Sequence, residues 1–218
     1  MFLVDILSGG YDAVEIILIL LAFALSVTIA ITLHEFAHAF AALKAGDPSA
    51  KLAGRLSINP AAHLEPVGLL CFLLAGIGWA KPVPVNPFNY RNFKHGNFWV
   101  SISGVLTNLV IGFIASFFYY LIAAYGGGGI LMFGLGWFFA LLMIINLSLA
   151  VFNLLPIPPL DGYNMLVSFT KPDNRFMRGM RENSMIFLMI FVLFGGFVIF
   201  AIRGFLMDSF LSLWGAII

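Results

Sequence analysis

Residues 96–160 contain no charged side chain and no histidine, and this uncharged stretch limits the possible folds more than any other feature of the sequence. One membrane-spanning helix needs about 20 apolar residues, so the stretch is too long for a single crossing. Four consecutive glycines at 126–129 divide it. We therefore predict two membrane-spanning helices, over residues 98–124 and 130–152, joined by a short glycine loop.

The composition agrees with this prediction. Of the 218 residues, 61% are hydrophobic and only 10% are charged, whereas about a quarter of the residues in soluble domains are charged. The chain is therefore predicted to be an integral membrane protein surrounded by a lipid bilayer. Its net charge of +1 and the lack of a Lys/Arg-rich run argue against a nucleic-acid partner. The single cysteine, Cys71, excludes a disulfide framework, and we expect it to be a small packed side chain.

Two further crossings are predicted, over residues 16–33, with apolar character continuing to 43, and over residues 184–202. Residues 66–80 are apolar but short and glycine-containing, which favours a re-entrant or interfacial segment. The tail at 204–218 is also short and is expected to lie in the interface. The predicted fold is all-α, with about four transmembrane helices, the re-entrant segment, and short cytoplasmic β-strands at 51–58 and 83–85. The N-terminus lacks a basic region, so no cleavable signal peptide is expected.

The basic residues predict the orientation of the chain. Ten of the eleven Lys and Arg residues fall between the first and second crossings or between the third and fourth, and only Arg203 lies elsewhere. Basic connections face the cytoplasm in most membrane proteins. We therefore expect both connections on the cytoplasmic side.

The first apolar helix carries two histidines and a glutamate, as His34-Glu35-Phe36-Ala37-His38. An ionisable side chain in a membrane helix is costly unless it is paired or functional. Residues four apart project from one face of a helix, so both imidazoles can bind one metal ion. Glu35 lies about 100° round the helix, where its carboxylate can take a proton from a water beside the metal. The pattern predicts a metal site with a general base.

A catalytic zinc site needs three protein ligands and one open position. His63 and His95 are the remaining histidines, but both lie in polar stretches where a solvated histidine is ordinary. Asp161 is a better candidate because it is the first charge after the uncharged stretch and follows prolines that end the helix. The predicted topology also places it on the same side as His34. The alternative is that Asp161 only caps the next helix.

Together, His34-Glu35-Phe36-Ala37-His38 and Pro159-Leu160-Asp161-Gly162 resemble the site-2 protease family of intramembrane zinc metalloproteases, specifically its compact members without PDZ or CBS domains. Residues 46–48, 54–60 and 78–87 resemble that family as well, so the resemblance covers roughly residues 33–163. Members of the family often have Gly-Pro-x-x-Asn in the next core helix. Here only Gly104 and Asn108 carry over, because Val105 stands in place of the proline.

The resemblance implies that one zinc ion per chain is held by His34, His38 and Asp161, with Glu35 as the general base. It implies hydrolysis of peptide bonds within or next to a transmembrane segment of a membrane-protein substrate, in a bacterial-type cell (inner) membrane with the active site towards the cytoplasm. We expect one transmembrane metalloprotease domain over residues 1–218. Its expected parts are a zinc-binding helix (14–43), a cytoplasmic and re-entrant loop region (44–97), a helix pair (98–152), the third-ligand motif (153–170) and a last crossing (184–203).

Three side chains and one segment have less defined roles. Asn153 and Asn108, amides in apolar helices, could donate hydrogen bonds to the charge that develops on the substrate oxygen, or could bind a neighbouring helix. His63 precedes the re-entrant segment, so it could reach the zinc, gate access to it, or lie on the surface. The predicted strand at 83–85 could take an unwound substrate by strand addition, or could be an ordinary proline-rich loop.

Two other functions stay open at this point. A metal transporter also places histidines and carboxylates in membrane helices, but it does not require a base between two ligands. A non-catalytic membrane scaffold would have no reason to keep every ligand. His34 precedes Lys44 by about 15 Å of helix, which places the predicted zinc inside the protein and near the cytoplasmic side. The sequence indicates neither the identity of the substrate nor the oligomeric state.

Overall fold

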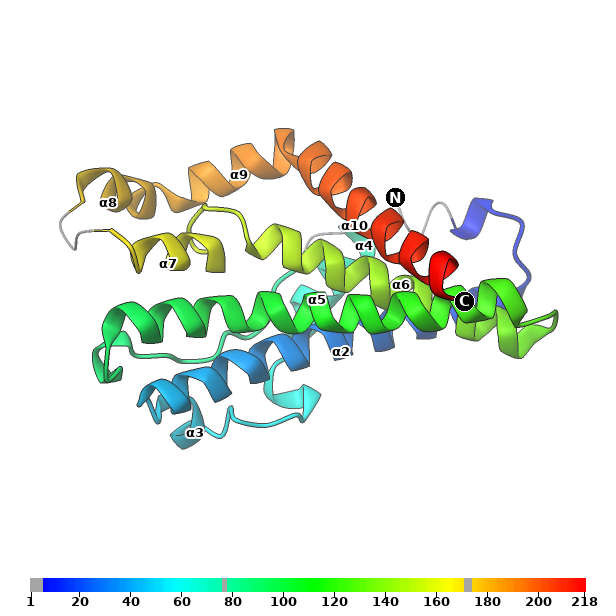
Figure 1. The fold of residues 1–218 in the computed structure, drawn as a ribbon. Coiled ribbons are helices and arrows are strands. Elements are labelled where there is room, and N and C mark those ends of the chain that lie inside the picture. Colours follow the sequence, from blue (N-terminus) through cyan, green and yellow to red (C-terminus); the bar gives the residue numbers. More distant parts are fainter. Residues whose placement is uncertain (1–5, 76–77, 171–173) are drawn as a thin grey trace.

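The computed structural model describes residues 6–75, 78–170 and 174–218, and the regular structure in these ranges is helical (Figure 1). In chain order the elements are α2 (Ala13–Ala45), α3 (Ser49–Leu52), η1 (Pro60–Ala62), α4 (Pro66–Ala75), η2 (Pro87–Asn89), α5 (Phe93–Tyr125), α6 (Ile130–Asn153), α7 (Asp161–Val167), α8 (Arg175–Glu182), α9 (Ser184–Phe194) and α10 (Gly196–Ile217).

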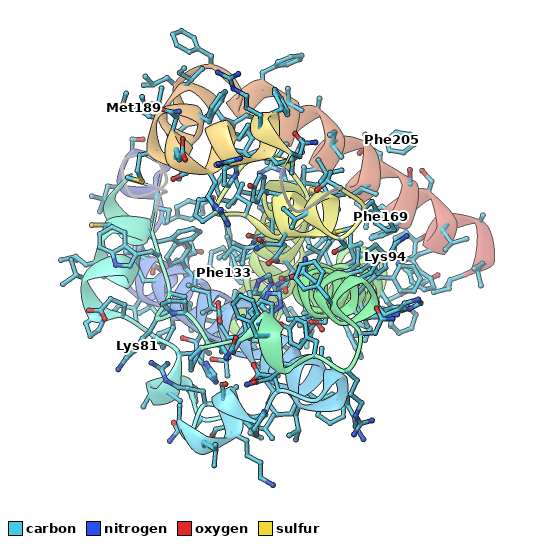
Figure 2. The ribbon with its side chains drawn as sticks, turned by 90° about the vertical axis from the view of Figure 1, so that its left-hand side faces the viewer. Lys81, Lys94, Phe133, Phe169, Met189 and Phe205 are labelled. Carbon is cyan, nitrogen blue, oxygen red and sulfur yellow. The ribbon has the colours of Figure 1, made fainter. Side chains whose placement is uncertain are left out.

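Three long helices, α2, α5 and α6, lie side by side and form the centre of the molecule (Figure 1). Helices α2 and α6 run in one direction and α5 runs in the other. The end of α2, the start of α5 and the end of α6 therefore lie at one end of the bundle. The two connections that carry the basic residues lie at this end, which we call the basic end; it faces the viewer in Figure 2. There, the ammonium of Lys94 lies 5.2 Å from the ring centroid of Phe169.

Local sequence sets both ends of α2. The Asp12 side chain accepts a hydrogen bond from the Glu15 backbone at 2.8 Å, and the Glu15 side chain accepts one from the Asp12 backbone at 3.0 Å. This reciprocal capping box satisfies backbone donors that the first turn leaves free. At the other end Gly46 has φ 114°, a left-handed conformation that suits glycine and stops the helix. The 33 residues between these caps extend about 50 Å, enough to cross a bilayer.

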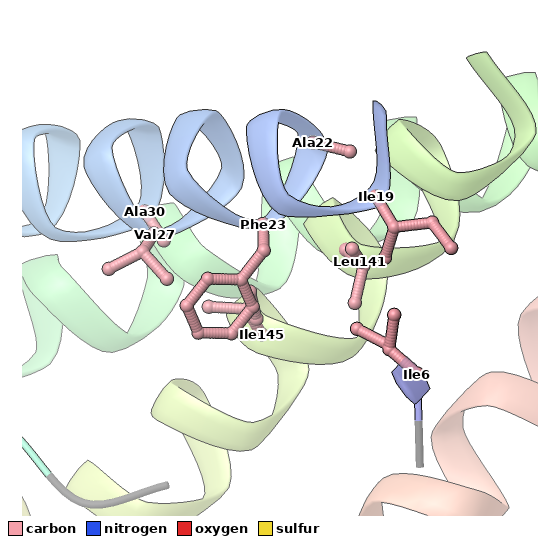
Figure 3. Close-up of a cluster of buried hydrophobic side chains, with 8 residues drawn as sticks. All are labelled: Ile6, Ile19, Ala22, Phe23, Val27, Ala30, Leu141 and Ile145. Atoms are coloured by element: carbon pink, nitrogen blue, oxygen red, sulfur yellow. The ribbon is translucent and has the colours of Figure 1, made fainter. Parts of the chain in front are cut away.

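The apolar faces of α2 and α6 meet in a buried cluster (Figure 3). Its members are Ile6, Ile19, Ala22, Phe23, Val27, Ala30, Leu141 and Ile145. The ring of Phe23 also stacks on Phe72 of α4, with centroids 5.7 Å apart. This packing fixes α2 against α6 and brings α4 beside them.

Four helices of the described chain are long and apolar enough to cross a membrane, which confirms the expected number of crossings. They are α2, α5, α6 and α10. The expected position of the fourth is wrong. Residues 184–202 do not form one helix, because α9 ends at Phe194 and a new helix of 22 residues begins at Gly196. The tail at 204–218, expected to lie in the interface, belongs to this helix.

Arg203 explains the error in the fourth span. The predicted span stops just before this charge, but α10 continues through it. Its guanidinium Nη1 donates to Ser148 Oγ of α6 at 3.3 Å, and its Cζ lies 5.1 Å from the ring centroid of Phe200. A charged side chain inside a membrane helix is tolerated when it faces another helix and has a partner there.

The expected β-strands at 51–58 and 83–85 are also wrong, since the structure assigns no strand to either range. Residues 51–52 belong to α3, and Gly54, at φ 69°, turns the chain directly after that helix. The stretch from Pro82 to η2 has no regular secondary structure. Its prolines at 82, 84 and 87 lack a donor, and the N–H groups of Val83 and Asn86 donate to the side chains of Glu35 and Asp47 instead. Few backbone donors are left for a substrate strand, so strand addition here is not supported.

Helix α4 lies within the range predicted as re-entrant. It has 10 residues and extends about 15 Å, half of a hydrocarbon core, so it is too short to cross. Residues 76–77, in the same predicted segment, lie outside the described residues. The remaining residues of the predicted segment approach α4, because a Cβ on Gly68 would lie 2.0 Å from the backbone oxygen of Trp79.

Candidate active site

Three side chains that can bind a metal converge at the basic end of the bundle. His34 and His38, one turn apart on α2, bring their Nε2 atoms to 2.9 Å of each other. Asp161, in the first turn of α7, places Oδ2 at 3.4 Å from His34 Nε2 and 3.3 Å from His38 Nε2. The structure therefore brings together the three ligands expected from the sequence and its family resemblance.

These positions fit a zinc ion. A tetrahedral ion with bonds of about 2.0 Å holds its ligand atoms about 3.3 Å apart, close to both histidine–aspartate distances. The Oδ2 atom of Asp161 is buried and has no hydrogen-bond partner among the described residues. A buried carboxylate oxygen without a partner is costly, and a metal ion would provide that partner.

Helix α5 orients both imidazoles through contacts with their Nδ1 atoms. The Nδ1 atom of His38 lies 2.7 Å from the backbone oxygen of Val100, which can only accept, so Nδ1 carries the proton. The Nδ1 atom of His34 lies 2.5 Å from Asn108 Oδ1. Each ring thus has its Nε2 lone pair free for a metal, and the hydrogen bond at the other nitrogen fixes the ring plane.

Asn108 continues this hydrogen-bond chain into α6. It is fully buried, and its Nδ2 donates to Asn146 Oδ1 at 2.7 Å and to the Ala30 backbone at 3.3 Å. Asn146 in turn donates to the backbone of Leu142 at 2.8 Å. Because both amide hydrogens of Asn108 are directed to protein acceptors, its geometry fits the helix–helix role rather than that of a donor to substrate. Asn146 was not predicted from the sequence, although an amide in an apolar helix is a recognisable signal.

Gly104 allows α5 to approach the histidines. A Cβ atom at this position would lie 2.5 Å from His34 Cε1 and 2.5 Å from His38 Nε2, closer than any side chain can be. Val105, which stands where the family often has proline, lies within the continuous helix α5 and is 1% exposed. Glycine is therefore required where the helix backbone passes the rings.

Gly162, directly after Asp161, packs against the backbone of the loop that precedes α7. A Cβ at Gly162 would lie 2.1 Å from the backbone oxygen of Leu154, so only glycine fits after the aspartate. The residue that caps α7 is Leu160, and no side chain makes a capping hydrogen bond there. Asp161 therefore faces the histidines and does not act as a helix cap.

Glu35 lies next to the three ligands and faces a cavity of about 200 Å³ between α2, α4 and α6. Its Oε2 accepts a hydrogen bond from the backbone N–H of Val83 at 3.1 Å, which fixes the carboxylate. His34 and Asn153 line the same cavity. The Nδ2 atom of Asn153 donates to Leu149 of its own helix at 3.1 Å.

Asp47 holds the loop that carries Val83. The carboxylate is fully buried and accepts hydrogen bonds from the Asn86 backbone at 2.6 Å, from the Asn89 side chain at 2.8 Å, and from the backbone and hydroxyl of Ser49. Burial alone would raise the pKa of Asp47, but these hydrogen bonds lower it below its ordinary value. The Gly-Asp-Pro stretch thus ties the end of α2 to the segment that supports Glu35.

His63 is neither at the metal nor on the surface. It is fully buried, its Nε2 lies 2.7 Å from the Ser57 backbone oxygen, and its own backbone oxygen accepts from the Lys81 N–H at 2.9 Å. It therefore connects the loop after α3 to the segment before Val83. His95 is exposed on the first turn of α5 and lies outside the metal group.

Comparison with known proteins identifies the family. Residues 121–196 match the family model described as "Peptidase family M50". "Putative zinc metalloprotease YwhC" of Bacillus subtilis is 39% identical over 198 residues, which cover 88% of this chain and 90% of that protein. "Putative zinc metalloprotease Rip2" of Mycolicibacterium smegmatis is 31% identical over 153 residues, which cover 66% of this chain and 55% of that protein.

The relative "Putative zinc metalloprotease Rip2" of Mycobacterium tuberculosis is 28% identical over 172 residues, which cover 76% of this chain and 64% of that protein. No solved structure matches the chain. The similarity to YwhC extends over nearly the full length of both proteins, which favours a zinc-dependent membrane protease over a transporter or a scaffold. The chain belongs to peptidase family M50, the site-2 type of zinc metalloprotease.

Proposed function

We propose that His34, His38 and Asp161 hold one zinc ion, and that Glu35 is the general base for hydrolysis of a peptide bond within or next to a transmembrane segment of another protein. The observation that carries this proposal is the convergence of the three ligand atoms within 4.8 Å of one another, beside a carboxylate that faces a cavity. A transporter would not need that carboxylate held in place by a backbone donor.

When bound, zinc polarises the scissile carbonyl and makes a water acidic enough to attack it at neutral pH. Glu35 has one oxygen committed to the Val83 N–H and the other available in the cavity. It takes the proton of the attacking water and delivers it to the leaving amine. Asn153 lines the cavity, and among the described residues its amide donates only to Leu149, so it is placed to donate to the substrate carbonyl oxygen.

The cavity walls suit an apolar, extended stretch of substrate. Phe72, Trp79 and Phe152 line it together with the polar residues of the site. A helical substrate segment has its peptide groups bonded within the helix, so it must unwind before its carbonyl can reach the zinc ligands. The volume of about 200 Å³ admits a few side chains rather than a whole helix, which supports cleavage of a locally unwound segment.

The basic end of the bundle supports a cytoplasmic position for the site. The connections that carry the Lys and Arg residues lie at the end of the bundle where α2 ends and α7 follows α6 (Figure 1), and α2 and α7 carry His34 and Asp161. By the positive-inside rule this end faces the cytoplasm of a bacterial-type inner membrane. The active site would then lie within the protein near the cytoplasmic surface.

The decisive experiment is Glu35→Gln in proteoliposomes with a single-span membrane substrate. The variant should retain one zinc per chain by elemental analysis and lose cleavage by about 100-fold to 10,000-fold, the usual contribution of a general base. His34→Ala is the matched variant, which should lose both zinc and cleavage. Cleavage by Glu35→Gln at the wild-type rate would contradict the proposed role.

A further inference from the structure

A second hollow lies at the basic end, between the last turns of α2 and the first turns of α5, apart from the cavity at Glu35. It encloses about 530 Å³. Three basic side chains, Lys44, Arg91 and His95, line it together with three large apolar ones, Phe40, Trp99 and Leu106. We call it the basic groove.

The charged side chains of the groove have no acidic partner. Neither Lys44 nor Arg91 makes an ion pair with any residue that the structure describes, and no acidic residue lines the groove. The Lys44 ammonium lies 5.3 Å from the centroid of the Phe40 ring, and the Arg91 backbone is held to α2 by a hydrogen bond to Ala45 at 2.9 Å. Two cations thus line one hollow without a counter-charge from the described residues, an arrangement that attracts an anion.

The apolar side chains extend the groove along the membrane-spanning part of α5. Trp99 is 56% exposed, Phe40 47% and Leu106 43%, so each leaves an apolar face uncovered. Leu106 lies about 16 Å along the helix from His95. The groove therefore has a basic head at the end of the bundle and an apolar wall that continues towards the bilayer centre.

We propose that the basic groove binds an anionic phospholipid of the leaflet at this end, with its phosphate between Lys44, Arg91 and His95 and an acyl chain along Trp99 and Leu106. A free phosphate would leave the apolar wall uncovered, and a zwitterionic lipid would leave the cations without a net negative charge. An anionic lipid satisfies both parts of the groove. The inference does not depend on the proposed protease function.

Quenching of tryptophan fluorescence tests it. Protein is reconstituted in phosphatidylcholine vesicles that contain increasing amounts of phosphatidylglycerol with brominated acyl chains. The part of the quenching that is lost in Trp99→Phe reports contact at the groove. In wild type, brominated phosphatidylglycerol should quench Trp99 at a mole fraction at least about tenfold lower than brominated phosphatidylcholine does. The double variant Lys44→Gln/Arg91→Gln should raise the half-saturating fraction by about 25-fold, at about fivefold for each charge removed.

The matched control is Lys51→Gln/Arg175→Gln, which removes the same charge from exposed positions outside the groove. It should shift the half-saturating fraction less than about twofold. Equal quenching by the two lipids, or equal weakening in both double variants, would overturn the proposal. Displacement of the lipid by inorganic phosphate in the millimolar range would assign the site to free phosphate and would also overturn it.

Discussion

The three central helices and the C-terminal helix α10 are all apolar enough to cross a membrane, yet they are held in place differently. The central helices bury polar side chains that bond from one helix to another, such as His34, Asn108 and Asn146. Helix α10 has no buried residue. It contacts α5 mainly through aromatic rings, with Phe210 and Trp214 about 5 Å from the ring of Phe113.

The difference shows what specifies position inside a bilayer. Lipid tails are as apolar as leucine, so apolar contact alone gives two helices little reason to prefer each other. Close approach at small residues and hydrogen bonds between helices provide that preference, and both are present where α5 meets α2. The proposed metal ligands depend on this contact, whereas the hydrogen bonds of α10, from Arg203 to Ser148 and from Trp214 to Ser116, involve none of these ligands. We therefore expect damage to the centre to remove zinc and damage to α10 to leave it bound.

The largest effect on zinc affinity is expected from Gly104→Ala. The added methyl group would lie 2.5 Å from both histidine rings, so the rings or the whole of α5 must move. Zinc affinity should fall by about 100-fold or more, measured by competition with a chromogenic chelator. The control is Gly136→Ala in α6, where the new Cβ would meet only Ile122 at 3.8 Å. Zinc loss in the control, or full zinc retention in Gly104→Ala, would contradict the close-approach argument.

A smaller loss of zinc affinity is expected from Asn108→Ala. The substitution removes the acceptor that holds His34 Nδ1 at 2.5 Å and leaves the imidazole free to turn. Partners of metal-bound histidines typically contribute 10-fold to 100-fold to metal affinity, so we expect a loss of about that size.

Asn153→Ala is the contrasting variant to Asn108→Ala, because its amide bonds only to Leu149 of its own helix among the described residues. It should keep wild-type zinc affinity and lose cleavage. Equal zinc affinities for the two asparagine variants would show that the chain from α2 to α6 does not support the metal.

The sequence predicted which side chains meet at the candidate site better than it predicted their supports. The spacing of His34 and His38 follows from helix geometry alone, and Asp161 is conspicuous as the first charge after a long apolar stretch. Asn108 was recognised as unusual, but which of its atoms faces which helix depends on the packing of α5 against α2. The N–H of Val83 that holds Glu35 is a backbone group, so the sequence carries no sign of it.

Two features of the fold were also mispredicted for identifiable reasons. The alternation at 51–58 suggested a strand, but the short helix α3 and the positive φ of Gly54 determine the structure there. The last crossing was ended at Arg203 because hydropathy counts the charge without its partner on α6. In both cases a tertiary or local contact outweighed the pattern.

The smallest effect, a slight loss of stability, is expected from Trp214→Phe, which tests the packing of α10. In the wild type, the indole Nε1 donates to Ser116 Oγ at 2.9 Å, and the rings of Phe113 and Phe117 pack against the indole. Phenylalanine keeps an aromatic ring but loses the hydrogen bond, a net cost of about 1 kcal/mol. For a chain of this size, that lowers the Tm by about 2–4 °C. Zinc content and cleavage rate should not change, because the Trp214 contacts to Ser116, Phe113 and Phe117 include none of the proposed metal ligands. A variant that folds and yet loses zinc would show that α10 shapes the active site and that the two regions are not independent.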